Sequence, residues 1–148
     1  MSGGAAPELV FFDTNVLVYA HDASEPRKRD IARGWILAAL GADTLRTSTQ
    51  ALSEYFSVVT SKGQQRMSAR GAGWLLDQLP AEAVVTPGLD VVRAAAARCA
   101  GLSIWDALIV EAARTSGSAV LLSEDARLRE AVDPRADRIR VVDPFLAQ

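Results

Sequence analysis

The sequence predicts a three-layer α/β/α sandwich with a mainly parallel central sheet, built as one domain. Short apolar segments alternate with helical segments along the chain, which is the pattern of a doubly wound sheet. Residues 9–12 are apolar and aromatic without a polar interruption, as expected for a strand buried on both faces. The chain has 148 residues and 49% hydrophobic content, which is enough for one sizeable core.

The predicted elements follow from periodicity and from the residues that start and stop helices. We expect strands at residues 9–12, 44–48, 83–85, 119–122 and 138–142. We expect helices at residues 16–20, 27–40, 49–62, 68–79, 87–99, 103–116 and 124–131. Thr14 and Asn15 can cap the first helix, and Ser24 can cap the second, which has Pro26 in its first turn. The apolar side of the second helix is predicted to contain Ile31, Trp35, Ala38 and Ala39.

Bulk properties exclude several classes of protein. The net charge is −2 and the pI is near 5.4, so the chain lacks the overall basic field of proteins that coat nucleic acid. The single cysteine, Cys99, excludes an internal disulfide and a cysteine-based zinc site, and fits the reducing cytoplasm. We expect a disordered leader over residues 1–7, a single domain over residues 8–148, and no membrane-spanning segment. One local basic cluster, at the start of the second helix, is a candidate for phosphate contact or a solvated face: Arg27, Lys28, Arg29 and Arg33.

Asp13 is the first candidate functional residue. It is the only charge between residues 9 and 20 and follows directly after the first predicted strand. Open α/β sheets bind ligands at the carboxyl ends of their strands. A turn or cap aspartate is the ordinary alternative, but a buried carboxylate is costly without a partner or a metal. We therefore predict a functional role for Asp13.

Three further acids lie at informative positions, each with a plain structural alternative. Glu54 is on a predicted helix face that is half apolar, although it could be a solvated acid. Asp106 follows Ser103 at the spacing of a capping box, yet it lies beside apolar residues on a face that we expect to point inward. Asp125 follows a buried strand in a helix-start sequence. The neighbouring Glu124 could take its role, and Glu111 is the acid we expect to be solvated in the helix of Asp106.

Together these acids predict a metal site. Carboxylates at strand ends and inward helix faces, without nearby histidine or cysteine, are the ligands of hard cations such as Mg²⁺ or Mn²⁺. Without a cation they would repel one another and bind protons. Such sites typically serve phosphoryl transfer, in which the metal polarises phosphate oxygens and activates water.

Four segments carry a resemblance to a known family. They are residues 12–17 (FDTNVL), 52–56 (LSEYF), 101–113 (GLSIWDALIVEAA) and 121–125 (LLSED), in this order. They resemble the motifs of the PIN domain, and specifically those of VapC toxins of type II toxin–antitoxin systems. The first and third motifs are specific, whereas the second and fourth count only through their order and spacing.

This resemblance implies a Mg²⁺- or Mn²⁺-dependent endoribonuclease with a PIN-like fold. The positions that match the family's acids are Asp13, Glu54, Asp106 and Asp125, with Asp13 and Asp106 as direct metal ligands. Glu54 and Asp125 would bind through water or orient the attacking water, and the products would carry a 5′-phosphate and a 3′-hydroxyl. Polar residues that match the lining of the same pocket are Asn15 and Ser123.

The resemblance also implies partners. Family members are neutralised by a small cognate antitoxin, VapB-like, whose C-terminal segment lies in a hydrophobic groove, and they usually form homodimers. Trp35, Trp74 and Tyr55 are candidate surface anchors for such contacts, or else core residues. His21 and Cys99 match no functional position of the family. The sequence does not specify which RNA is cut.

Three alternative functions compete with this interpretation. A haloacid-dehalogenase-like phosphatase needs a second aspartate two residues after the first, where this chain has Asn15. A response-regulator receiver domain needs a lysine after a late strand, and neither Lys28 nor Lys62 is so placed. The serious alternative is a catalytically weak PIN-fold partner-binding module, which would have little reason to retain four mutually repelling acids.

Overall fold

The computed structural model describes residues 4–61 and 67–146 and contains a five-stranded sheet in the order β3-β2-β1-β4-β5. Every neighbouring pair of strands is parallel. The strand bounds are β1 Val10–Phe12, β2 Leu45–Ser48, β3 Val84–Val85, β4 Val120–Leu122 and β5 Arg140–Val142. The predicted parallel α/β/α architecture is confirmed, and all five strands lie within the predicted segments.

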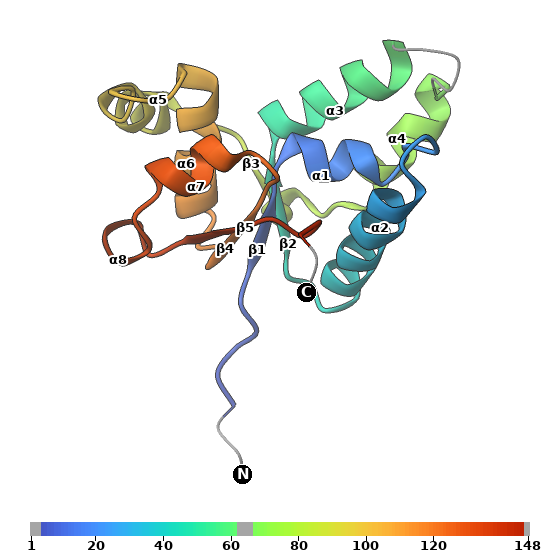
Figure 1. The fold of residues 1–148 in the computed structure, drawn as a ribbon, viewed down its shortest axis with the longest axis horizontal. Coiled ribbons are helices and arrows are strands. Elements are labelled where there is room, and N and C mark those ends of the chain that lie inside the picture. The colour runs from blue at the N-terminus through green and yellow to red at the C-terminus, as the bar shows by residue number, and fades with distance from the viewer. Residues whose placement is uncertain (1–3, 62–66, 147–148) are drawn as a thin grey trace.

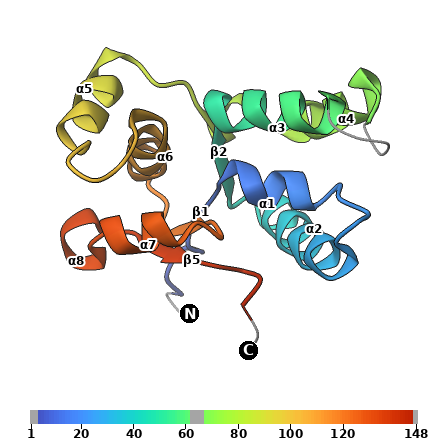
Figure 2. The same ribbon diagram turned by 45° about the horizontal axis from the view of Figure 1, so that its top comes forward.

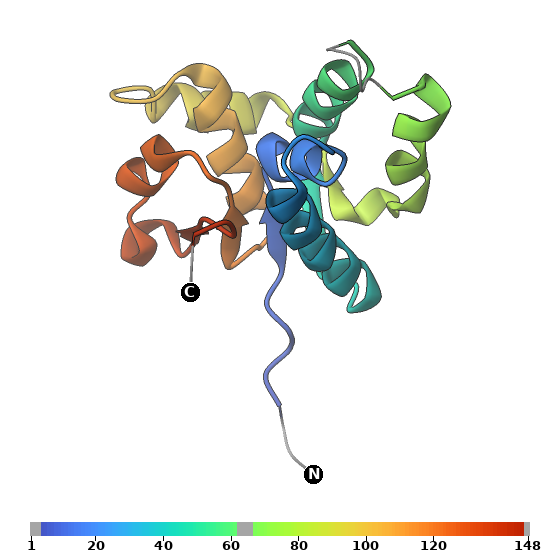
Figure 3. The ribbon, with the colours of Figure 1, turned by 45° about the vertical axis from the view of Figure 1, so that its right-hand side comes forward.

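Helices cover both faces of the sheet. Helices α1 to α4 cover one face and α5 to α8 cover the other (Figures 1, 2 and 3). Their bounds are α1 Thr14–Tyr19, α2 Pro26–Gly41, α3 Thr49–Ser61, α4 Ala69–Gln78, α5 Leu89–Ala97, α6 Ile104–Thr115, α7 Ala126–Ala131 and α8 Pro134–Asp137, with a 3₁₀ turn at Ala81–Ala83. Within the described residues, none of these helices has the length and apolar character needed to cross a membrane.

Successive residues of the central strands supply two separate cores. Phe12 and Leu122 pack with the helices of one face, whereas Phe11 and Leu121 pack with those of the other, and all four are fully buried. Because side chains alternate across a strand, a strand with helices on both faces needs apolar residues at every position. This requirement explains the unbroken apolar segment before Asp13.

The strand order places the first acid at the point where the sheet reverses direction. From β1 the chain first builds β2 and β3 on one side, and then crosses to build β4 and β5 on the other. The backbone N–H of Asp13 donates to the carbonyl of Leu122 at 3.0 Å, so the carboxyl ends of β1 and β4 lie side by side. Ligands of open α/β sheets bind at such a switch point.

The caps of the first two helices differ from prediction. Asp13 itself is the N-cap of α1, because its side chain accepts from the N–H of Thr14, and Thr14 and Asn15 are in the first turn. The N-cap of α2 is Glu25, which makes no side-chain cap bond. Ser24 instead donates its backbone N–H to Asp22 at 2.9 Å. Lys62 and Gly63, the predicted end of the third helix, lie outside the described residues.

The buried face of α2 was predicted only in part. Ala39 is buried as predicted, and Ile31 and Trp35 pack against the core while partly exposed. Ala38 is exposed, and the other buried residues are Ala32 and Ile36. The helix has apolar residues on more than one side, so its sequence did not identify which side packs. Tyr55 on α3, for which the sequence left a surface or a core role open, is fully buried and therefore a core residue.

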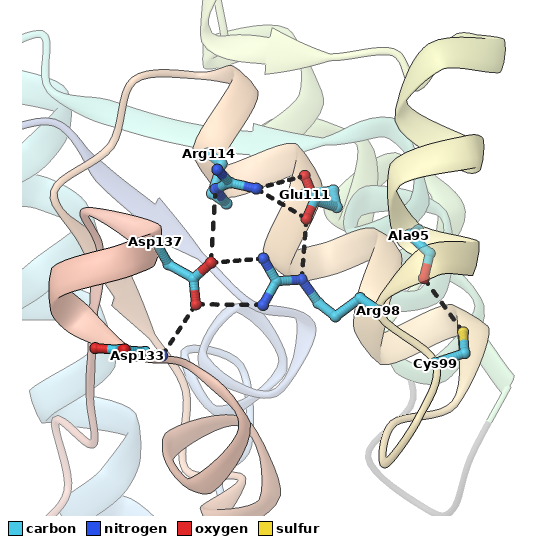
Figure 4. A network of polar contacts seen from close by, with 7 residues as sticks. All are labelled: Ala95, Arg98, Cys99, Glu111, Arg114, Asp133 and Asp137. Carbon is cyan, nitrogen blue, oxygen red and sulfur yellow. Dashed lines mark hydrogen bonds and ion pairs between the residues drawn. The ribbon is translucent and has the colours of Figure 1, made fainter.

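An ion-pair network joins α5, α6 and α8 and overturns the prediction for Glu111 (Figure 4). Glu111 is 6% exposed, not solvated. Its carboxylate accepts from Arg98 at 2.9 Å and from Arg114 at 3.1 Å, and Arg98 also pairs with Asp137 at 2.6 Å. Helix α8, which supplies Asp137, was not predicted. The network therefore holds α8 in place, and its four residues are too few to show the apolar periodicity from which a helix is predicted.

Candidate active site

Asp13 is the deepest acid of the site, and every oxygen of its carboxylate is hydrogen-bonded. Oδ1 accepts from the backbone N–H of Thr14 at 2.7 Å. Oδ2 accepts from Ser123 Oγ at 2.7 Å and from Asn15 Nδ2 at 3.3 Å. Asn15 Nδ2 also donates to Ser123 Oγ at 3.0 Å. The two residues that were predicted to line the pocket therefore orient Asp13.

Burial raises the pKa of Asp13 to about 6, although the hydrogen bonds from Ser123 and Thr14 oppose that shift. The negative charges of Glu54 and Asp106 raise its pKa further. Glu54 reaches this end of the sheet through its bond with Thr14, the residue after Asp13. A carboxylate held in this environment gains stability from a proton or from a cation.

Glu54 is exposed on α3, and two side chains hold it toward the site. Its Oε2 accepts from Thr14 Oγ1 at 3.0 Å, and its Oε1 accepts from Gln50 Nε2 at 3.1 Å. Gln50 Nε2 also donates to the carbonyl of Trp105 at 3.2 Å, which ties α3 to the first turn of α6. Glu54 is thus a solvent-accessible acid with a defined orientation.

Asp106 and Asp125 approach the site from the starts of α6 and α7. Ser103 Oγ accepts from the N–H of Asp106 at 3.1 Å, which is the capping bond that the spacing predicted. The Asp106 carboxylate is 25% exposed and lies 3.9 Å from the guanidinium of Arg127. Asp125 caps α7, and its own N–H donates to Ser123 Oγ at 3.1 Å. All four predicted acids therefore converge on one end of the sheet.

Glu124 has a different role from its neighbour. Its carboxylate accepts from Lys28 Nζ at 2.9 Å and from Tyr19 Oη at 2.8 Å. Its backbone N–H donates to Asn15 Oδ1 at 3.3 Å. Glu124 thereby anchors the loop after β4 to α1 and α2, and the geometry favours Asp125 as the acid of the site.

The basic cluster at the start of α2 is engaged within the chain. Lys28 pairs with Glu124, and Arg29 pairs with Asp30 at 3.0 Å. Arg27 donates to the carbonyl of Phe145, and Arg33 donates to the carbonyl of Ala20. These bonds explain the cluster without a phosphate ligand.

The residues of the site fit a hydrated Mg²⁺ or Mn²⁺. Among residues 4–61 and 67–146, no three histidine, cysteine or acidic side chains lie close enough to enclose a metal by themselves. Mg²⁺ does not need such a cage, because it keeps several waters and is usually bound by one or two carboxylates together with substrate phosphates. The carboxylates of Asp13, Glu54, Asp106 and Asp125 offer an all-oxygen donor set of this kind.

Ser123 gives a testable link between the site and stability. Ser123→Ala removes the hydrogen bond that lowers the pKa of the buried Asp13 carboxylate. We expect it to lower the free energy of unfolding by about 1–3 kcal/mol at pH 8. The loss should be smaller at pH 5, where Asp13 is protonated. Urea denaturation at both pH values measures it, and Ser118→Ala, at another buried serine, is the control. An equal loss at both pH values would contradict the coupling to Asp13.

Comparison with known proteins places the chain. The sequence model of the PIN domain matches residues 10–133. The chain belongs to the PIN domain family. PIN domains are generally metal-dependent nucleases, so membership supports a nuclease.

A solved structure shares the PIN fold. It is described as FitAB bound to an IR36 DNA fragment, and it is 15% identical in sequence to this PIN domain. The match covers 95% of this chain and 98% of that chain, with a TM-score of 0.69. No curated protein matches the sequence.

Sequence reasoning missed the residues that orient the acids. Thr14 and Gln50 hold Glu54, and Arg127 holds Asp125. Gln50 is four residues before Glu54, so helical spacing makes it a surface neighbour of that acid but does not by itself assign the hydrogen bond. Thr14 contacts Glu54 across 40 residues of sequence, and no local pattern predicts such a bond.

Proposed function

We propose that this PIN domain is a Mg²⁺- or Mn²⁺-dependent endoribonuclease that acts as the toxin of a VapBC-type toxin–antitoxin system. The observation that carries the proposal is the buried Asp13 carboxylate at the switch point of the sheet, to which bonds of Thr14 and Ser123 bring Glu54 and Asp125. A purely structural aspartate at this position would not require two further acids beside it.

Each acid has a proposed role. Asp13 and Asp106 would bind the cation directly, and Glu54 and Asp125 would bind it through water or orient the attacking water. When bound, the cation supplies polarisation of the phosphate oxygens and a lower pKa for water. Thr14 and Gln50 fix the direction of Glu54, so this exposed acid is the residue best placed to align a water. The expected products carry a 5′-phosphate and a 3′-hydroxyl.

An apolar groove between α2 and α4 supports a protein partner. The cavity is about 240 Å³, and Leu37 and Trp74 beside it are 63% and 50% exposed. Its lining residues are Ala20, His21, Arg33, Ile36, Leu37, Trp74 and Leu75. Of the three proposed anchors, Trp74 alone is well exposed. We propose that the C-terminal segment of a small VapB-like antitoxin occupies this groove, and that the PIN domain forms a homodimer.

Cleavage of purified total RNA tests the proposed activity. The wild type, Asp13→Asn and the surface control Asp77→Asn are each incubated with Mg²⁺, Mn²⁺ or a chelator, and new 5′ ends are sequenced. We expect discrete cuts by the wild type and Asp77→Asn that need the metal, and none by Asp13→Asn. Cuts that persist in Asp13→Asn or in chelator would refute the site. A DNA substrate in parallel tests the preference for RNA.

Expression in growing cells separates the toxin from a partner-binding module. If RNA cleavage is the function, the wild type arrests growth and Asp13→Asn does not. If the protein acts by binding alone, Asp13→Asn keeps the effect, because Asp13 is buried and is not among the residues that line the groove. Arrest by both proteins would therefore favour the binding module.

A further inference from the structure

One exposed cation is built into the acidic site. The guanidinium of Arg127 holds Asp125 with two bonds, from Nε to Oδ1 at 3.2 Å and from Nη2 to Oδ2 at 2.9 Å. Nη2 also lies 3.9 Å from Asp106 Oδ2. Among the ion pairs of the described residues, Arg127 is the only cation that pairs with any of the four site acids.

A chain of hydrogen bonds connects Arg127 to Asp13. Ser123 Oγ donates to Asp13 and accepts from the N–H of Asp125, whose carboxylate in turn accepts from Arg127. The same carboxylate caps the backbone N–H of Arg127 at 2.9 Å. The guanidinium is therefore oriented relative to Asp13 and is not a freely moving surface charge.

Arg127 is nevertheless open to a ligand. Its side chain is 72% exposed. Within the described part of the chain, both hydrogens of its Nη1 lack a protein acceptor, since only Nε and Nη2 bond to Asp125. An arginine fork with free donors, held by a carboxylate behind it, is suited to a phosphate.

We propose that Arg127 binds a backbone phosphate of the RNA substrate and positions it beside the acids. This inference rests on the proposed function. A polyanion that approaches four carboxylates needs a compensating charge close to the reacting phosphate, and Arg127 provides it next to Asp106. The other arginine on the outside of α7, Arg129, is exposed, has no acid partner among the described residues, and serves as a matched control.

Salt-dependent binding of a single-stranded RNA oligonucleotide tests the proposal. All proteins carry Asp13→Asn so that the RNA stays intact, and Kd is measured at several KCl concentrations for Arg127→Ala, Arg127→Lys and Arg129→Ala. One lost contact to a single strand reduces the slope of log K against log salt by about 0.7. We expect this reduction and about tenfold weaker binding for Arg127→Ala alone. Arg127→Lys should retain the slope, because it keeps the charge.

A charge-neutral double variant excludes an indirect effect through Asp125. If Arg127 only neutralises that carboxylate, Arg127→Ala combined with Asp125→Asn will restore parental binding and overturn the proposal. If Arg127 contacts phosphate, the reduced slope will persist. Asn retains the N-cap of α7, so the double variant should fold, and thermal unfolding checks this. Equal effects of Arg127→Ala and Arg129→Ala would also overturn the proposal.

Cleavage assays distinguish this inference from the function on which it rests. If the wild type cleaves RNA and Arg127→Ala cleaves it at the same rate, the phosphate contact is refuted and the proposed nuclease function stands. Absence of wild-type cleavage, with binding that still depends on Arg127, would refute the nuclease and keep the contact. A single-stranded DNA of the same sequence shows whether the contact needs ribose.

Discussion

Asp13→Asn will stabilise the metal-free protein at neutral pH while removing its nuclease activity. The pKa of Asp13 is raised from 3.8 to about 6, mainly by burial. Its protonated form is therefore favoured by folding, so its contribution to stability is full below pH 4 and is lost as the pH rises through 6. At about 1.4 kcal/mol per pKa unit, the ionised carboxylate costs about 2–3 kcal/mol above pH 6. Asparagine has the same shape and no charge, so it avoids this cost, and loss of the bonds that Oδ2 accepts from Ser123 and Asn15 offsets part of the gain.

Urea denaturation of wild type, Asp13→Asn and Asp77→Asn at pH 4 and pH 8 measures the effect. We expect Asp13→Asn to gain about 2 kcal/mol at pH 8 and much less at pH 4, and the exposed Asp77→Asn to change little at either pH. Mg²⁺ should stabilise the wild type and leave Asp13→Asn unchanged. A destabilised Asp13→Asn at pH 8 would show that the carboxylate is a structural cap and not a strained ligand.

The activity should move in the opposite direction. Loss of a direct ligand forfeits several kcal/mol of transition-state stabilisation, which corresponds to a ~10³-fold or greater fall in the cleavage rate. If one isosteric change makes the protein more stable but inactive, the replaced carboxylate contributes to catalysis and not to folding. An active and more stable variant would place the reaction elsewhere.

The second large effect is structural: Arg98→Met should destabilise the fold by about 3 kcal/mol. The side chains of Glu111 and Asp137 are 8% and 11% exposed, so both would lose their main cation inside the protein. Removing one partner of a buried ion pair costs about 3–5 kcal/mol. We expect the lower end, because Arg114 still pairs with Glu111 at 3.1 Å. Arg98 also lowers the pKa of Asp137 below 3.8, so its stabilisation is present near neutrality and is lost in stronger acid.

The matched control is Arg93→Met, which removes an exposed arginine from the same helix. It should change the free energy of unfolding by less than about 0.5 kcal/mol. In a Glu111→Gln background, Arg98→Met should lower the free energy of unfolding by at least about 1 kcal/mol less, because only the Asp137 carboxylate is then left without its cation. Equal costs in both backgrounds would show that Arg98 acts by packing alone.

The parts of the fold that were predicted from the sequence are those determined by residues close to one another along the chain. The segment before Asp13 is apolar at every position because its side chains fill two cores, one on each face of the sheet. The charged Asp13 that follows therefore stands out in the sequence and marks the end of the strand as the candidate site. Ser68 and Ser103 were read correctly as helix starts because a cap bond depends on nearby residues alone.

The parts that sequence missed depend on contacts between distant segments. Asp106 and Glu111 are both acids on α6, and local sequence favoured solvent for Glu111. The structure buries it because Arg98, 13 residues earlier, supplies a partner. Likewise, the sequence around Arg127 indicates only an arginine at the start of a helix. The structure places its guanidinium 3.9 Å from Asp106, which lies 21 residues earlier in the sequence.

The most direct test of the account is Mn²⁺ binding followed by electron paramagnetic resonance. Wild type, Asp13→Asn and Asp77→Asn are titrated at pH 5 and pH 8. We predict that the wild type and Asp77→Asn bind Mn²⁺ more tightly at pH 8, where Asp13 is ionised, and that Asp13→Asn loses the site. Binding by Asp13→Asn that equals the wild type, or an absence of pH dependence between 5 and 8, would contradict a metal centre at Asp13.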